Sequence, residues 1–460
     1  MFGRMRAVVT LGAVLAGTLL LSAPRESQAV PSFARQTGQP CATCHTIFPA
    51  LTAYGRQFKL NGYVSNSGQV IQTKDVDQKD KQMLEIGSIP PISVMILTSY
   101  TATQKMQPGA ERNGDVLLPD QFSLFLAGEI APKAGAFVQA TYTQVDDHFS
   151  WDNTDIRAAD QATFGNQSFV YGVSLNNNPT VQDLWNSTPA WGYPYAGAEN
   201  APAPGAGTLI DGALGAQVVG LSAYTMWNNL LYAELGMYRA SPTGATRPLS
   251  GVNGDVPAGD VVDRVGPYWR LAFQKQFGEH YLMVGAYGIS ADVLPGANLP
   301  SGPVPLTGAT NNFNDVAADL QYEKSFGDGD TSLAVHSTYI HETQKLGAYV
   351  ADGDATNLND KLNTFRADAT FIYKREYSGS LGYFSTTGST DALLYAANTT
   401  LKPDSSGVTG ELAYMPWLNT KLAVDYTAYT KFDGASTNYD GTGRNANNNN
   451  TLFVYAWLIF

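Results

Sequence analysis

Two cysteines and a histidine form the sequence feature best suited to chemistry: Cys41-Ala42-Thr43-Cys44-His45. The Cys-x-x-Cys-His spacing is typical of a covalently attached c-type heme, in which two thiols bond to the porphyrin and the adjacent imidazole binds the iron. The chain has no further cysteine to complete a zinc site, and the motif lacks the βαβ context typical of a redox Cys-x-x-Cys. The sequence therefore predicts one heme c, bound by Cys41 and Cys44, with His45 as proximal ligand.

Three basic side chains lie close to this motif in the sequence. Residues 30–70 contain Arg35, Arg56 and Lys59 and no Asp or Glu, although the whole chain carries a formal net charge of −12. Guanidinium and ammonium groups bind carboxylates, so the three are candidate partners of the heme propionates. The alternative is that they are solvated surface charges. The acidic balance of the chain argues against a general nucleic-acid binder, which needs basic surface.

The first 29 residues have the order of a secretory signal. Arg4 and Arg6 precede an uncharged stretch at residues 7–23, and small residues follow at residues 27–29. We therefore expect export and removal of residues 1–29, with a retained N-terminal anchor as the alternative. Beyond this segment the sequence has no uninterrupted apolar run of about 18 residues, the length expected of a transmembrane helix.

From about residue 90 to the end, apolar and polar residues alternate with period two, as in half-buried strands. In one such segment, Phe365, Phe371 and Tyr373 alternate with Arg366 and Asp368. The sequence contains sixteen candidate strands of this kind: residues 91–103, 119–131, 134–146, 152–161, 167–176, 213–226, 228–241, 264–277, 279–291, 313–325, 331–344, 361–374, 378–389, 407–415, 420–431 and 451–460.

The connections between these segments alternate in length. Short turns are expected near residues 278 and 375–377, for example, and longer polar loops at 177–212 and 432–450. An even strand number with short turns at one end and long loops at the other is typical of an outer-membrane barrel, whereas a propeller or sandwich does not explain the alternation. We therefore expect a mainly β fold: a 16-stranded antiparallel transmembrane β-barrel in outer-membrane lipid, with its long loops facing outward.

The expected domains are a signal at 1–29, a small α-helical heme c plug at 30–80 and a porin-like barrel at 81–460. Even parity places both ends of the barrel on the periplasmic side, so the plug is expected to enter from there. A distal heme ligand is not evident. Met95 is a candidate because strand parity points it to the lumen together with Ser93 and Leu97, and plain wall packing is the alternative.

Residues 33–63 contain a run of short motifs in this order: Phe33-Ala-Arg-Gln-Thr-Gly38, Cys41-x-x-Cys44-His45, Pro49-x-Leu51, Gly55-Arg56-x-Phe58-Lys59 and Gly62-Tyr63. The run resembles the fused monoheme cytochrome–porins of the bacterial outer membrane, the family associated with oxidation of extracellular ferrous iron. The resemblance implies an oxidoreductase in which a heme in the pore takes electrons from outside and passes them to a periplasmic carrier, a cytochrome or a cupredoxin.

Fe(II) favours imidazole and carboxylate ligands, which makes Asp146, Asp147 and His148 candidate docking residues; a solvated acidic loop is the alternative. Two functions remain open. The first is an electron conduit, for Fe(II) or for another donor. The second is a diffusion porin whose heme plug is structural or gating. Porins of this size are often trimers, so a homotrimer is possible, although the sequence has no interface signal.

Overall fold

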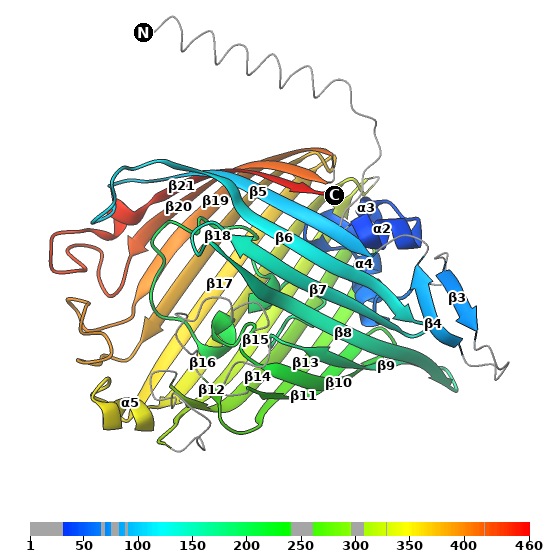
Figure 1. Ribbon diagram of the computed structural model, residues 1–460, viewed down its shortest axis with the longest axis horizontal. Helices are drawn as coiled ribbons and strands as arrows, with labels where there is room; N and C mark the ends of the chain where they lie inside the picture. The colour runs from blue at the N-terminus through cyan, green and yellow to red at the C-terminus, as the bar shows by residue number, and fades with distance from the viewer. Residues whose placement is uncertain are drawn as a thin grey trace, which may run out of the picture.

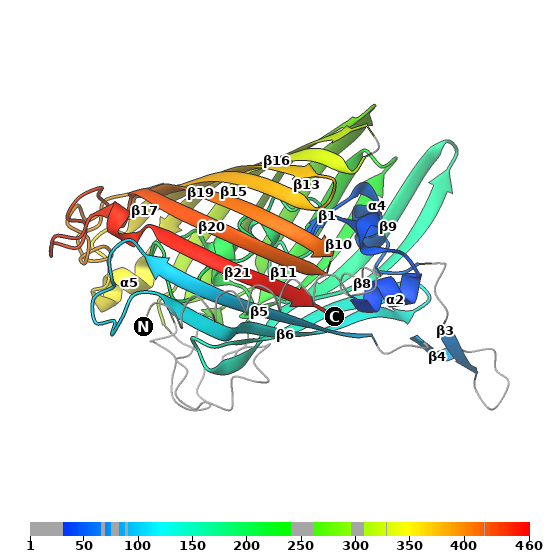
Figure 2. The ribbon, with the colours of Figure 1, turned by 90° about the horizontal axis from the view of Figure 1, so that it is seen from above.

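A computed structural model describes residues 31–65, 70–74, 82–87, 91–240, 261–295, 308–327, 329–417 and 419–460. The expected signal, residues 1–29, lies outside them. The N-terminal elements are short: α2 (Pro31–Thr37), α3 (Cys41–Cys44), β1 (His45–Ile47), β2 (Ala50–Leu51) and α4 (Ala53–Leu60). An antiparallel hairpin of β3 (Val70–Lys74) and β4 (Gln82–Gly87) follows, outside the barrel (Figure 2).

Sixteen long antiparallel strands of the described chain close into a barrel, as the alternation predicts. Each strand pairs with the next along the chain, and β21 pairs with β5 to close the sheet. The two-residue β12 (Val261–Val262) pairs with β14 at one rim. The long strands are β5 (Ile92–Thr103), β6 (Asp115–Ala131), β7 (Ala134–Thr143), β8 (His148–Phe164), β9 (Gln167–Asn176), β10 (Val219–Trp227), β11 (Leu231–Arg239), β13 (Gly266–Phe277), β14 (His280–Leu294), β15 (Asn311–Phe326), β16 (Thr331–Lys345), β17 (Asn359–Tyr373), β18 (Tyr377–Gly388), β19 (Ser405–Trp417), β20 (Thr420–Lys431) and β21 (Thr451–Ile459).

The expected alternation of side chains is also present. On β17, Phe365, Phe371 and Tyr373 face outward and are exposed, whereas Thr364 and Asp368 are buried in the lumen. Closure pairs the backbone groups of every strand within the protein, as hydrocarbon surroundings require. The same apolar exterior continues around the barrel through Leu126, Val173, Leu221, Leu235, Leu271, Val316, Leu381 and Leu412. None of the helices within the described ranges is long and apolar enough to cross a membrane.

The two ends of the barrel differ in the length of their connections. One end has seven short turns: 132–133, 165–166, 228–230, 278–279, 327–330, 374–376 and 418–419. The other end has the longer loops, two of which contain the short helices α5 (Gly347–Asp352) and η5 (Ala446–Asn449), together with a four-residue connection at 144–147. Short turns face the periplasm in outer-membrane barrels, which defines the periplasmic mouth and the outward end.

One long connection departs from the expectation that the long loops face outward. Residues 177–218, hereafter the inward loop, fold into the lumen; they contain η1 (Pro189–Trp191) and η2 (Leu209–Ala213). Leu184, Trp185 and Ile210 are buried there, and such side chains could not remain in water without cost. Because residues 213–218 belong to this loop, β10 begins at Val219 rather than at residue 213.

Residues 31–63, hereafter the plug, occupy the periplasmic mouth (Figure 1, blue, close to the C-terminus). Two of their partners lie on short turns. Gln57 donates to Asn229 Oδ1 at 2.6 Å, and Arg375 donates to the carbonyl oxygen of Ala42 at 3.3 Å. The chain thus places its Cys-x-x-Cys-His motif inside the ring of strands.

Candidate functional site

The two cysteines lie on one turn of helix, α3, with His45 directly after it. Residues three apart share a helix face, and all three side chains line one cavity of about 370 Å³, hereafter the cofactor cavity. The cysteines form no disulfide, and burial raises the pKa of Cys41 to about 12 and that of Cys44 to about 11. Both are therefore protonated thiols at neutral pH.

His45 is oriented by a backbone contact. Its Nδ1 lies 3.2 Å from the carbonyl oxygen of Pro49, so Nδ1–H donates to that oxygen and Nε2 is left as the free acceptor. Burial lowers the pKa of His45 to about 4, and the ring is neutral at physiological pH. A neutral imidazole fixed at Nδ1 is the form that binds a metal through Nε2.

Helix α4 packs tightly on this motif because of two of its residues. The Thr52 hydroxyl caps α4 by accepting from the backbone N–H of Gly55 at 3.1 Å, and it donates to the carbonyl oxygen of Thr43 at 2.5 Å. A Cβ at Gly55 would lie 2.2 Å from the carbonyl oxygen of Cys44, so only glycine permits this approach.

The opposite wall of the cofactor cavity belongs to the barrel and the inward loop. Met95, Phe125, Phe137 and Trp457 line it from the lumen face of β5, β6, β7 and β21, and Trp191 lines it from the loop. Met95 faces inward as its parity predicts and is 4 % exposed. Two thiols, an imidazole with a free Nε2, a thioether and aromatic walls are chemically suited to a covalent heme, so the residues present fit that group.

The three basic residues expected at the propionates are not brought together. Lys59 alone lines the cofactor cavity; its Nζ donates to the carbonyl oxygen of Val181 at 2.7 Å. Burial and repulsion from Arg157 lower the pKa of Lys59 to about 7. Arg56 is bound instead to Glu323 on β15, at 2.6 and 3.1 Å, and Arg35 donates to the carbonyl oxygen of Ile92.

Asp146, Asp147 and His148 lie at the outward connection of β7 and β8 without converging. Tyr142 OH donates to Asp147 at 2.8 Å, and the Thr143 hydroxyl donates to Asp146 at 2.8 Å. Across the described ranges, no three His, Cys, Asp or Glu side chains are grouped so that they could hold a metal ion. The sequence thus identified acidic groups in this region, and the fold gives them hydroxyl partners rather than a common centre.

The sequence analysis missed the inward loop as part of the site. Arg270 on β13 binds Asp183 of this loop at 3.0 Å and Asp319 of β15 at 2.7 Å. Arg366 on β17 binds Asp211 of the loop through two contacts of 2.7 Å. The available signal was the pair of tryptophans, Trp185 and Trp191, in a segment interpreted as a polar loop.

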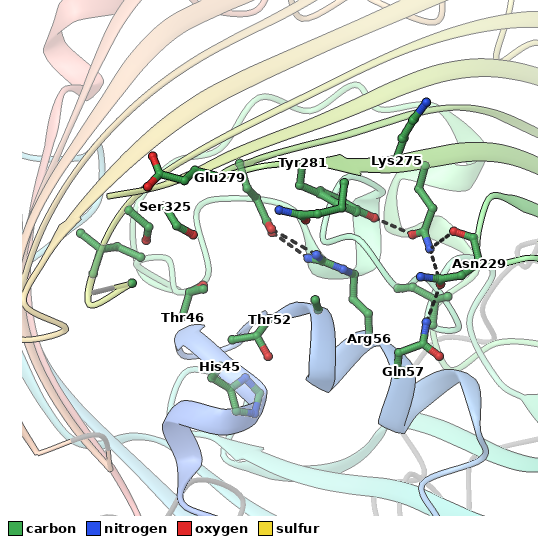
Figure 3. A pocket seen from close by; sticks show the side chains of 18 of the residues that line it. His45, Thr46, Thr52, Arg56, Gln57, Asn229, Lys275, Glu279, Tyr281 and Ser325 are labelled. Atoms are coloured by element: carbon green, nitrogen blue, oxygen red, sulfur yellow. Dashed lines mark hydrogen bonds and ion pairs between the residues drawn. The ribbon is translucent and has the colours of Figure 1, made fainter. Parts of the chain in front are cut away.

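A second cavity, of about 480 Å³ and hereafter the mouth recess, lies between the plug and the short turns (Figure 3). In Figure 3, Arg56 of the plug points to the wall that carries Tyr281. His45 lines both the mouth recess and the cofactor cavity. The imidazole therefore stands between the cofactor cavity and the periplasmic mouth.

A third cavity, of about 590 Å³ and hereafter the outward cavity, lies between the inward loop and the outward halves of β17–β21. It shares Pro189, Gly192 and Pro194 of the loop with the cofactor cavity. Three cavities thus follow one another through the lumen, from the outward end to the periplasmic mouth.

Comparison with known proteins gives solved structures alone: no family model matches the chain, and no curated protein does. The chain is similar to a loop L8 deletion mutant of OmpT, an outer membrane protein of Vibrio cholerae (11% identity, 80% of this chain and 98% of that chain, TM-score 0.44). It is also similar to an anion-selective porin from Comamonas acidovorans (12%, 80% and 98%, TM-score 0.45). A third is the outer membrane channel DcaP of Acinetobacter baumannii (10%, 80% and 96%, TM-score 0.43).

The similarities at these TM-scores carry no argument about this chain. The assignment of its architecture rests on the pairing of its own strands. A closed barrel of sixteen antiparallel strands, apolar outside and largely polar within, is a porin-like barrel of the outer membrane.

Proposed function

We propose that this protein is an outer-membrane electron conduit that oxidises extracellular Fe(II) through one c-type heme and passes the electrons to a periplasmic carrier. Cys41 and Cys44 would hold the heme covalently, with His45 as proximal ligand and Met95 as distal ligand. When bound, the heme supplies a one-electron redox centre within the membrane-spanning wall.

One observation carries this proposal: the Cys-x-x-Cys-His side chains share a cavity with lumen-facing residues of the barrel. The hydrocarbon core of a membrane is about 30 Å thick, which is too far for efficient electron transfer without a cofactor inside it. A cofactor at this position would lie within the barrel, and the outward cavity and the mouth recess adjoin its site on either side.

The residues of the chain prepare this site before any cofactor binds. Pro49 fixes the tautomer of His45, and Phe125, Phe137 and Trp457 give one side of the cavity an apolar surface. The thioether of Met95 lines the same cavity as His45, and Met/His ligation would favour the reduced state of a bound heme because it raises the reduction potential. A conduit for electrons from Fe(II) needs such a high potential.

The charge of the two ends supports an outward cationic donor. Among the described residues, and without the inward loop, the outward connections contain ten Asp and Glu and five Lys and Arg, whereas the periplasmic turns contain three and three. An acidic rim raises the local concentration of cations. Fe(II) would therefore accumulate at the outward end and not at the mouth.

The test is reduction of the heme in intact cells by Fe(II) held in a membrane-impermeant chelate, recorded as a reduced-minus-oxidised difference spectrum. We expect a c-type spectrum that depends on Cys41 and Cys44. The matched control is the same cells with the chelate of a redox-inert divalent metal.

A porin with a structural or gating plug gives another result. In that case Fe(II) leaves the heme oxidised, and liposomes containing the purified protein leak small solutes. That pair of outcomes would rule out the conduit. If a different extracellular donor reduces the heme and Fe(II) does not, the protein is still an electron conduit but Fe(II) is not its substrate.

A further inference from the structure

The outward cavity contains polar groups that the described chain leaves without partners. Asp425 on β20 and Tyr193 of the inward loop both line it and are 4 % and 6 % exposed. Within the described ranges, Asp425 Oδ1 and the Tyr193 hydroxyl have no hydrogen-bond partner. Buried polar groups are nearly always satisfied by protein, water or ligand, so Asp425 and Tyr193 have hydrogen-bonding capacity left for what fills the cavity.

The charge around the cavity identifies the sign of a ligand that would fit there. Asp425 lies directly across from Glu411 on β19, and Lys421 lies 2.8 Å from Glu411, whose carboxylate also accepts from Tyr455 OH at 2.7 Å. Two neighbouring carboxylates therefore share one ammonium group. Asp425 also bonds to Glu411, which requires a proton shared between the two carboxyl groups, and a bound cation would take the place of that proton as counter-charge.

The other two acidic groups named on the cavity wall have cationic partners. Asp368 lines the cavity and lies 3.1 Å from Nδ1 of His336. Asp211 lines it as well, but its charge is matched by Arg366 through two contacts. Arg366 and His336 therefore match Asp211 and Asp368, and the acidic group left on this wall is Asp425.

We propose that the outward cavity is a binding site for a hydrated divalent cation, held by Asp425 and Asp368 with the Tyr193 hydroxyl. No three acidic, His or Cys side chains of the described chain converge on a point, so the ion keeps its water shell and the protein contacts that shell. A cavity of about 590 Å³ has room for the ion with its waters.

The position of this site gives it a use. The partition between the outward cavity and the cofactor cavity is the loop segment that contains Tyr193 and Tyr195, whose ring centroids are 5.9 Å apart. Tyr193 lines the first cavity and Tyr195 the second. A cation in the outward cavity is thus separated from the cofactor cavity by one layer of side chains.

Cation binding does not depend on the proposed function. Only its consequence, the transfer of an electron to the heme, rests on that proposal. If the cation is Fe(II), one electron leaves it and one ferric heme becomes ferrous, while the resulting Fe(III) leaves outward; no other reactant is needed. Cation binding itself requires no electron transfer, so the two proposals can fail separately.

The experiment titrates Mn²⁺ into the heme-loaded full-length protein in detergent and measures free Mn²⁺ by electron paramagnetic resonance. Mn²⁺ is a divalent ion of suitable hydration that does not reduce the heme. We expect one saturable site, which Asp425→Asn weakens about tenfold because one charge is removed at short range. Asp440→Asn, in the exposed outward loop, is the matched control and should leave binding unchanged.

A second variant is expected to have the opposite effect. Arg366→Gln removes the positive charge from the cavity wall and frees the carboxylate of Asp211, so Mn²⁺ should bind about tenfold more tightly. The inference is overturned if wild-type protein shows no saturable site, or if Asp425→Asn and Asp440→Asn bind alike while both keep the native heme spectrum. If Fe(II) still reduces the heme when either result is found, the electron-conduit proposal stands and only the cation site is rejected.

Discussion

The lumen wall around the plug has two contrasting arcs. The arc of β21 and β5–β7 is mostly apolar near the plug, with buried Met95, Leu97, Phe125, Phe137 and Trp457 packed as one cluster. The arc of β8–β17 carries charges, and its arginines and carboxylates bind the plug and the inward loop. An ordinary porin lumen is polar all round, so the apolar arc requires an explanation.

The difference between the arcs separates two tasks. The charged arc positions polypeptide: Glu323 holds the plug through Arg56, and Arg270 and Arg366 hold the inward loop. The apolar arc meets the plug through the carbonyl oxygen of Ile92, which accepts from Arg35, and it faces the Cys-x-x-Cys-His motif across a cavity. Ion pairs thus fix the plug and the inward loop on one side, and a mostly apolar surface faces the cofactor cavity on the other.

Removing the thiols should produce the largest effect. In Cys41→Ala/Cys44→Ala, we expect no covalent heme in a denaturing gel stained for heme. The barrel should still form, because its closure involves no plug residue. Heat-modifiable gel mobility reports on the barrel independently. Covalent heme that persists in this variant would contradict the assignment of the cofactor to the apolar arc.

Breaking one ion pair of the charged arc should loosen the plug. Arg56 and Glu323 are 5 % and 20 % exposed at their side chains, and Arg56→Met leaves a largely buried carboxylate without its partner. We expect the free energy of plug opening to fall by about 3 kcal/mol, measured by hydrogen exchange of the amides in α4. Arg112→Met, which removes an exposed pair with Asp115, is the control and should change little. Equal exchange in the two variants would show that Glu323 does not hold the plug.

The sequence predicted the barrel and the orientation of Met95 more fully than it predicted the charged arc. Strand parity is a local property, so the inward orientation of Met95 and the strand count followed from alternation alone. The partner of Arg56 did not, because Glu323 is 267 residues away and only barrel closure brings it to the plug. The inward loop was missed for the same reason: its contacts with Arg270 and Arg366 are made across the lumen.

A change at Met95 tests whether the apolar arc supplies an iron ligand as well as packing. If Met95 is the distal ligand, Met95→Leu should lower the reduction potential of the heme by on the order of 0.1 V, since a thioether ligand raises it. Redox titration followed at the heme band measures this shift. Met283→Leu makes the same change at a buried lumen position outside this cluster and should leave the potential unchanged. If Met95 only packs against its neighbours, Met95→Leu should lower the free energy of unfolding by less than about 1.5 kcal/mol and leave the reduction potential of the heme unchanged.

The smallest expected effect comes from Lys59, the one expected basic residue that reaches the cofactor cavity from the plug. Burial lowers its pKa to about 7 in the closed plug, whereas an open plug returns the amine to its usual pKa of about 10.4. The open state therefore binds more protons between these values, so closure of the plug becomes more favourable as pH rises through this window. We expect a gain of about 1 kcal/mol between pH 7 and pH 8 in the free energy of plug opening, measured by hydrogen exchange after correction for the intrinsic rate. Lys59→Met should abolish this slope while keeping the plug closed, because the methylene stem still packs on the cavity wall. A slope that survives in Lys59→Met would mean that another group on the charged arc titrates there.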